Sequence, residues 1–167
     1  EGVFLDSNEK VIHPSQIHSL LHLINVGILT SNAQLSMSDE KEPAILGDTT
    51  EGALLVLGQR ASLDIETVRN ADKKVFEAPF TSERKMMSVI VEMADTKDYF
   101  LFSKGAPEII FSLCKLNEKE KKALLKTVGS LAADGLRSLA FAGRKLTKTE
   151  VKKALEEETV KEINLEY

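Results

Sequence analysis

The sequence predicts an α+β domain in which one mainly antiparallel sheet is combined with helices. The chain has 167 residues, close to the ~150 of a typical globular domain, so one hydrophobic core is expected. Apolar residues alternate in several short segments, as in strands, and recur at helical spacing in others. Consecutive predicted strands are joined by turns that are too short for a crossover helix, and this requires antiparallel pairing.

The N-terminal part is predicted to contain a hairpin, a helix and a loop. Alternating residues around the turn formers at positions 6–8 predict a hairpin over residues 2–12. Apolar side chains at helical spacing predict a helix over residues 14–29, with Ser15 available as its N-cap. Residues 31–43 are polar and irregular, which predicts a loop.

The middle of the chain is predicted to be mostly sheet. A helix begins after Gly47, where Asp48 or Thr49 can accept hydrogen bonds from the open backbone donors. A second short helix is expected at residues 63–68. The three strands predicted next cover residues 74–78, 86–93 and 99–103, and a turn at 95–98 joins the last two.

Three helices and two strands are predicted in the last third of the chain. Pro107 in a first turn starts a helix that ends near Cys114. Asn117 with Glu120 forms a capping-box pattern for the next helix, which Gly135 ends. The side chains expected to face the core from this helix are Leu124, Leu125, Val128, Leu131 and Ala132.

The chain is then expected to return to sheet and to end on a strand. Residues 136–146 have strand character, and Thr147 with Glu150 opens a last helix that runs through Leu155. Ile163 and Leu165 predict a closing strand.

Composition excludes several classes of function. The formal net charge is −4, so no basic excess is present to neutralise a nucleic-acid backbone. Aromatic residues are only 5% of the chain, too few for a surface that stacks a long single strand. The single cysteine, Cys114, fits a reducing compartment, and no apolar stretch approaches the ~20 residues of a membrane span. Because the chain begins at Glu1 without Met, we expect residues 1–167 to be one domain excised from a larger protein, monomeric when isolated.

Metal and phosphate-loop motifs give no strong signal. His18 and His22 lie four residues apart on one predicted helix, close to His13, a spacing that can hold a metal. No acidic third ligand lies at a suitable offset, so we predict surface histidines and no metal site. Neither a Walker-type loop nor a dinucleotide-binding fingerprint occurs.

Four short segments carry a more specific signal as a set. They are GDTTEGAL at 47–54, FTSERKMMSV at 80–89, SKGAPE at 103–108 and DGLRSLA at 134–140. Together, in this order and spacing, they resemble the nucleotide-binding domain of P-type cation-transporting ATPases, in the branch of the calcium and sodium/potassium pumps. The resemblance covers nearly the whole chain, and the motif Lys-Gly-Ala-Pro-Glu is its most specific part.

The resemblance implies a twisted, mainly antiparallel sheet flanked by helices, with ATP as the ligand. In the parent protein the nucleotide would be Mg-ATP, the partners would be the phosphorylation and actuator domains, and the location would be the cytoplasmic side of a membrane. The implied nucleotide-binding residues are Glu51, Phe80, Lys85, Met87, Lys104, Gly105, Arg137 and Leu139.

Several of these residues also have a physical rationale of their own. Phe80 follows Pro79 and precedes a charged turn, where its ring is exposed unless a base stacks on it or it caps the core. Lys104 stands beside Gly105, a small neighbour that lets a ligand approach the backbone closely and lets the ammonium reach a ring edge or a phosphate. By the resemblance, Lys85 is directed toward the phosphates and Met87 lies against the ring.

Two of the implied contacts have structural rivals. The resemblance implies that Glu51 accepts from the adenine amino group, but Glu51 also follows Asp48 at the spacing of a capping box. Arg137 suits phosphate or ribose oxygens, and the alternative is an ordinary surface ion pair.

One departure and one absence limit the resemblance. Many of these pumps have a phosphate-binding Arg at the position of Ser82, so we expect a weaker affinity dominated by adenine, with Arg84 and Lys85 available to compensate. The Asp-Lys-Thr-Gly phosphorylation motif of these pumps does not occur, so no catalytic residue is predicted, and the chain is expected to bind ATP without turning it over. The alternative is a regulatory or interaction domain that keeps the fold but has lost nucleotide binding.

Overall fold

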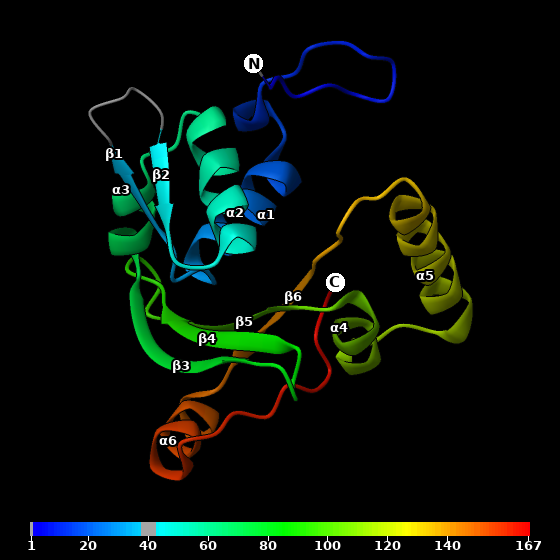
Figure 1. Ribbon diagram of the computed structural model, residues 1–167. Helices are drawn as coiled ribbons and strands as arrows, with labels where there is room; N and C mark the ends of the chain where they lie inside the picture. The colour runs from blue at the N-terminus through cyan, green and yellow to red at the C-terminus, as the bar shows by residue number, and fades with distance from the viewer. Residues whose placement is uncertain (1, 38–42) are drawn as a thin grey trace. The chain divides into compact units, whose positions relative to one another are not determined.

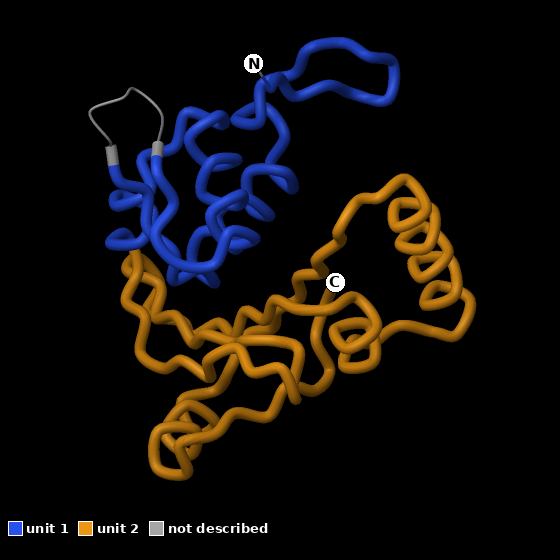
Figure 2. Tube along the Cα trace, viewed as in Figure 1, with its two compact units in different colours: residues 1–71 blue, residues 72–167 orange. Residues whose placement is uncertain are grey.

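The computed structural model describes residues 2–37 and 43–167. The chain divides into two compact units, Glu1–Ala71 and Asp72–Tyr167 (Figure 2). Each unit has its own cluster of buried hydrophobic residues. The elements are labelled in Figure 1. That residues 1–167 form one ATP-binding domain stays a prediction.

Unit 1 begins with a hairpin, as predicted, but without the two short strands expected on either side of its turn, and helices follow. The hairpin is closed by an isolated antiparallel bridge between Leu5 and Val11. The helical segment splits into a 3-10 turn, η1 (Pro14–Gln16), and α1 (His18–Leu29). Ser15 is therefore inside the 3-10 turn, and its prediction as the N-cap is wrong.

The segment predicted as a loop contains a two-stranded antiparallel sheet. β1 (Gln34–Met37) pairs with β2 (Pro43–Leu46). The prediction of a loop over residues 31–43 is wrong at 34–37 and at Pro43, and residues 38–42 lie outside the described residues. Each strand has only four residues, too few for a clear alternation of apolar and polar side chains.

Two helices complete unit 1. In α2 (Thr49–Arg60), the carboxylate of Asp48 accepts the Glu51 backbone N–H at 3.0 Å, so the predicted N-cap is confirmed. α3 (Ile65–Ala71) begins two residues later than predicted. α1 packs against both of these helices. The buried side chains of this core are Ile24, Ile28, Ala33, Leu55 and Ala61.

Unit 2 is built on a four-stranded antiparallel sheet with the order β3-β4-β5-β6. The strands are β3 (Lys73–Thr81), β4 (Met86–Glu92), β5 (Tyr99–Gly105) and β6 (Ala140–Leu146). The six strands pair antiparallel and are combined with helices, so the predicted α+β class is confirmed. The prediction of one sheet is wrong, because β1 and β2 form a second, separate sheet. β4 and β5 are the inner strands, and both faces of β4 are buried.

Three helices accompany the sheet of unit 2. α4 (Pro107–Leu113) packs on β5 and β6 and is capped at its end by Cys114, as predicted. α5 (Glu118–Ala133) starts with the predicted capping box, and Gly135 follows it with a φ of 77°. α6 (Lys148–Glu157) has the second predicted capping box.

Two details of unit 2 differ from prediction. On α5, three of the five predicted side chains pack against the core, but Leu131 and Ala132 are exposed. α5 has 16 residues and packs on α4, which has only seven, so α4 cannot cover it along its whole length. The predicted closing strand is reduced to isolated bridges of Leu165 with Cys114 and of Glu166 with Gly143. The core is formed by Met86, Ile90, Leu101, Ile110, Phe111, Ala140, Ala142, Leu146, Val151, Ala154 and Leu165.

Candidate functional site

Seven of the eight predicted binding residues belong to unit 2, and Glu51 belongs to unit 1. Phe80, Met87, Lys104 and Gly105 lie on three neighbouring strands of the sheet. The other three residues of unit 2 lie in turns or connections: Lys85, Arg137 and Leu139.

The sheet register aligns three of these residues in one row. Met87 on β4 lies directly opposite Lys104 on β5, so their side chains project from the same face. On the other side of β4 the register shifts between Ala78 and Thr81. Pro79 and Phe80 together therefore stand opposite Met87, as in a β-bulge. The row runs from Phe80 through Met87 to Lys104.

Phe80 is the exposed member of this row. Its side chain is 54% exposed, and it belongs to neither hydrophobic core. The alternative that Phe80 caps the core is therefore wrong. A large ring held at the bulge next to a buried Met87 offers a flat apolar face to a planar ligand.

Lys104 is buried, which is unusual for a lysine. It lies inside β5 rather than in a loop, and only 4% of it is exposed. Lysine is almost never buried to this degree without a partner, and Lys104 does have one within the protein. The buried position fixes the direction of its long stem far more tightly than a loop would.

Gly105 has a structural reason to be glycine. A Cβ atom there would lie 2.5 Å from the Lys85 carbonyl oxygen and 2.6 Å from the Cβ atom of Met86. The open space predicted beside Gly105 for a ligand is thus filled by the chain itself. A role of Gly105 in nucleotide binding stays a prediction.

Lys85 closes the turn between β3 and β4. Its φ is 53°, in the left-handed region, and its side chain is exposed. Its backbone N–H donates to the Thr81 carbonyl at 2.8 Å, and its own carbonyl accepts from Ala106 N–H at 3.0 Å. These bonds tie the turn to the segment that follows Lys104.

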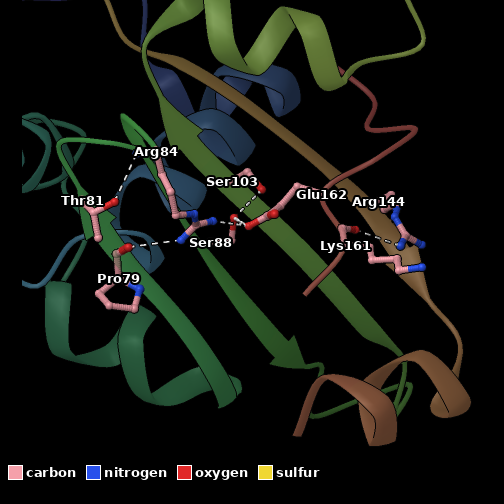
Figure 3. A network of polar contacts seen from close by, with 8 residues as sticks. All are labelled: Pro79, Thr81, Arg84, Ser88, Ser103, Arg144, Lys161 and Glu162. Atoms are coloured by element: carbon pink, nitrogen blue, oxygen red, sulfur yellow. Dashed lines mark hydrogen bonds and ion pairs between the residues drawn. The ribbon is translucent and has the colours of Figure 1, made fainter. Parts of the chain in front are cut away.

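Arg84, which was expected to compensate for Ser82, is engaged elsewhere. Its guanidinium forms an ion pair with Glu162 and donates to the Pro79 carbonyl at 3.2 Å (Figure 3). Because the positive charge is already paired with a carboxylate, Arg84 is a poor phosphate ligand. The expected compensation therefore rests on Lys85 alone.

Arg137 and Leu139 lie in the connection between α5 and β6. The prediction of a strand over residues 136–146 is wrong at 136–139, because strand pairing begins only at Ala140. Arg137 is exposed and Leu139 is partly buried. Ala140 pairs with Gly105, so the connection leads directly to the strand that flanks the row.

Glu51 has a structural role in unit 1. Its Oε2 atom accepts the backbone N–H groups of Asn32 at 2.7 Å and of Ala33 at 3.0 Å. The carboxylate therefore holds the first turn of α2 to the segment before β1. The sequence pattern gave no indication of these two bonds, and the adenine contact of Glu51 stays a prediction.

Glu162 is a residue that sequence reasoning missed. Its carboxylate accepts from the Ser88 hydroxyl at 2.9 Å in addition to pairing with Arg84. Two small polar residues in otherwise apolar strands, Ser88 and Ser103, were the available signal, since buried hydroxyls need partners.

Two surface hollows in the described part of the chain do not coincide with the predicted binding residues. A hollow of about 440 Å³ beside Lys145 and one of about 360 Å³ beside Arg69 contain none of the eight predicted residues. We therefore define the candidate site by strand register. Within residues 2–37 and 43–167, no three His, Cys, Asp or Glu side chains gather as metal ligands, and no helix is both long and apolar enough to cross a bilayer.

Comparison with known proteins finds relatives over most of the chain. The family model described as "P-type ATPase, cytoplasmic domain N" matches residues 19–166. A calcium-transporting ATPase of Bacillus subtilis (strain 168) is 35% identical over 147 residues, which are 82% of this chain and 16% of that protein. Calcium-transporting ATPase 1 of Saccharomyces cerevisiae is 32% identical over 153 residues, 84% of this chain and 15% of that protein.

A shorter match reaches a higher identity. The sodium/potassium-transporting ATPase subunit alpha of Drosophila melanogaster is 42% identical over 82 residues, 46% of this chain and 8% of that protein. In each of these three cases the chain spans less than a fifth of the relative's length.

Proposed function

This chain belongs to the family of P-type ATPase cytoplasmic N domains, and on that premise we propose that it binds ATP by the adenine ring. In a larger cation-transporting ATPase it presents the γ-phosphate to the phosphoacceptor aspartate of a separate phosphorylation domain. The nucleotide there is Mg-ATP, and the domain works on the cytoplasmic side of the membrane beside the phosphorylation and actuator domains.

The row of Phe80, Met87 and Lys104 is the observation that carries this proposal. Three strands hold it: the ladder between β4 and β5 sets Met87 opposite Lys104, and Phe80 lies in the bulge of β3 beside Met87. The exposed Phe80 ring stacks on the adenine, a contact of about 1–3 kcal/mol that needs no charge. Met87 supports the ring with a polarizable side chain, and Lys104 supplies the positive charge at one end of the row.

The phosphate end of the site has few positive charges available to bind phosphate. Ser82 stands where many family members have an arginine, and Arg84 is paired with Glu162. Lys85 and Arg137 are exposed cations that can reach phosphate oxygens. Adenine contacts therefore dominate the affinity.

The chain's role is to position the nucleotide. The sequence has no Asp-Lys-Thr-Gly motif, so we propose that the acceptor aspartate lies in the separate domain. Holding ATP in place makes phosphoryl transfer to that aspartate effectively intramolecular. The isolated chain binds ATP without accepting its phosphate.

The test is a titration with ATP, ADP and AMP followed by NMR for the unaltered chain and for Phe80→Ala. Loss of one stacked base predicts that all three nucleotides bind about 5- to 150-fold more weakly, with similar ratios. Leu155→Ala is the matched control, because Leu155 is 50% exposed on α6 and outside the row. It should leave the three affinities unchanged.

Two outcomes would contradict the proposal. A loss confined to ATP would mean that phosphate contacts, and not the ring, anchor the ligand. The absence of any shift at Phe80 and Lys104 with millimolar nucleotide would favour the second candidate, a regulatory domain that keeps the fold without binding nucleotide. Ser82 and the pairing of Arg84 are the observations that favour this candidate.

A further inference from the structure

We infer that Arg84 and Glu162 form a positioning pair, which fixes Phe80 in the geometry needed for nucleotide binding. The inference rests on the proposed function. It gives Arg84 a role other than phosphate binding, and it adds Glu162, which lies outside the four motif segments. Glu162 lies in the C-terminal segment, far along the chain from the turn that it stabilises (Figure 3). Neither residue needs to touch the nucleotide.

Arg84 connects the β3–β4 turn to the C-terminal segment. Its backbone N–H donates to the Thr81 hydroxyl at 3.1 Å, while one guanidinium nitrogen donates to the Pro79 carbonyl at 3.2 Å. The other guanidinium nitrogen pairs with Glu162. The planar fork of arginine can make both side-chain contacts at once, which a lysine ammonium on a flexible stem does less well.

The bond to the Pro79 carbonyl acts directly on Phe80. The peptide group is planar, so the Pro79 carbonyl oxygen and the Cα atom of Phe80 lie in one rigid plane. Both residues belong to the bulge, where the regular ladder between β3 and β4 is interrupted. A side-chain donor to this carbonyl therefore supplies a restraint where the sheet itself restrains least.

Glu162 is in turn fixed by a chain of hydroxyl groups in the sheet. Ser88 and Ser103 are completely buried, and their hydroxyl oxygens are 2.8 Å apart. The Ser88 hydroxyl has one proton and donates it to Glu162 at 2.9 Å, so the Ser103 hydroxyl is the donor to Ser88. The hydroxyl groups of β4 and β5 thus orient the Glu162 carboxylate toward Arg84.

The ion pair between Arg84 and Glu162 is partly buried. The side chains of Arg84 and Glu162 are 33% and 15% exposed, respectively, so solvent screens this pair less than a fully exposed one. The positive charge of Arg84 is neutralised locally. Its effect on binding must therefore be the same for nucleotides with one, two or three phosphates.

The test compares Glu162→Gln and Arg84→Met with the double variant in the full chain. We expect the double variant, which leaves no unpaired charge, to weaken AMP, ADP and ATP alike, by about 3- to 10-fold. Each single variant should show the same positioning loss. The charge that it leaves unpaired adds a change that grows with the number of phosphates, favourable in Glu162→Gln and unfavourable in Arg84→Met. Glu66→Gln is the control, since it removes a carboxylate from another arginine pair, 3.7 Å from Arg69, in unit 1. It should leave all three affinities unchanged.

A second measurement follows the backbone amides of Phe80 and Thr81 by NMR in the nucleotide-free protein. Both should shift in Glu162→Gln and Arg84→Met but not in Glu66→Gln. Arg84→Lys keeps the positive charge but removes the planar guanidinium, so it tests whether two simultaneous contacts are needed. We expect it to shift the same amides and to weaken the binding of AMP, ADP and ATP in equal proportion. This variant also provides a test if Arg84→Met does not fold.

The outcomes separate the two proposals. In the double variant, a loss of affinity confined to ATP would make Arg84 a phosphate ligand. Unchanged affinities with unchanged Phe80 amides would mean that the pair positions nothing. Either result overturns the inference. If the unaltered chain binds no nucleotide, the proposed function fails. The nucleotide-free amide shifts then decide alone whether the pair fixes Phe80.

Discussion

A Cβ atom at Gly105 would lie 2.5 Å from the carbonyl oxygen of Lys85 and 2.8 Å from the Cα atom of Met86. Both atoms belong to backbone that is held by hydrogen bonds, so they cannot rotate away as the end of a side chain can. We therefore expect Gly105→Ala to lower the free energy of unfolding by about 1–3 kcal/mol, the usual effect of overpacking. Urea denaturation measures it.

Gly129 provides the matched control. It lies inside α5, and an added Cβ atom would meet nothing within 4 Å. Gly129→Ala should raise the free energy of unfolding by about 0.5–1 kcal/mol, because alanine favours the helix. Equal stability of Gly105→Ala and the unaltered chain would show that the β4–β5 pair can yield, against the packing argument.

Residue types and motif order were enough to select Phe80 and Lys104, but not to predict their surroundings. Lys104 is buried because β5 lies between β4 and β6. The residue opposite it in the register of β6, Phe141, is distant in sequence. Glu162 was missed for the same reason, since its contact with Arg84 joins residues far apart along the chain. Contacts of this kind leave no local pattern.

Elements with local signals were the most predictable. Both capping boxes, Asn117 with Glu120 and Thr147 with Glu150, have the predicted reciprocal bonds, because each depends on only four consecutive residues. The strands β1 and β2 were missed because they are short and partly polar. The bulge at Pro79 and Phe80 could not be predicted, because it is a property of pairing between two strands.

The start of α6 makes a prediction about pH. The Glu150 carboxylate accepts the Thr147 backbone N–H and hydroxyl, both at 2.8 Å, and pairs with Arg144. These contacts, led by the Thr147 backbone N–H, lower the pKa of Glu150 from its ordinary value of 4.5. The folded state therefore gains stability from the charged carboxylate above pH 4.5, and this gain is lost as the pH falls through the folded-state pKa.

Glu150→Gln should accordingly destabilise the chain at neutral pH by up to about 1 kcal/mol, a modest effect because 42% of the side chain is exposed. The difference from the unaltered chain should shrink as the solution is acidified below pH 4.5. Urea unfolding at a series of pH values measures it, with Glu156→Gln as the control in an exposed pair of the same helix. A difference that stays constant with pH would contradict the assigned contacts.

At the scale of the whole molecule, the length fits one domain, yet the structure has two compact units with separate cores. The sequence contains no signal for this division. The boundary falls at Asp72, the only residue between α3 and β3, so no Pro-, Gly- or Ser-rich linker marks it. Only the grouping of buried side chains separates the units.

Separate cores predict separate responses to core truncation. Leu55 in unit 1 and Leu101 in unit 2 are both completely buried, and each belongs to a different cluster. Replacing either one by alanine removes a similar volume and costs about 2–5 kcal/mol. We expect Leu55→Ala to lower the hydrogen-exchange protection of amides in unit 1, such as Ile28, much more than that of amides in unit 2, such as Ile90.

Leu101→Ala should have the opposite pattern, so the two variants control for each other in the same full chain. The reason is that an amide is exposed by the opening of its own packed unit, and its protection follows the free energy of that opening. Hydrogen exchange in the native state, read by NMR for both variants, measures the two free energies separately. If each truncation lowered protection equally at Ile28 and Ile90, the two clusters would unfold as one cooperative core. The division into two units would then be a feature of the folded structure without a counterpart in its unfolding.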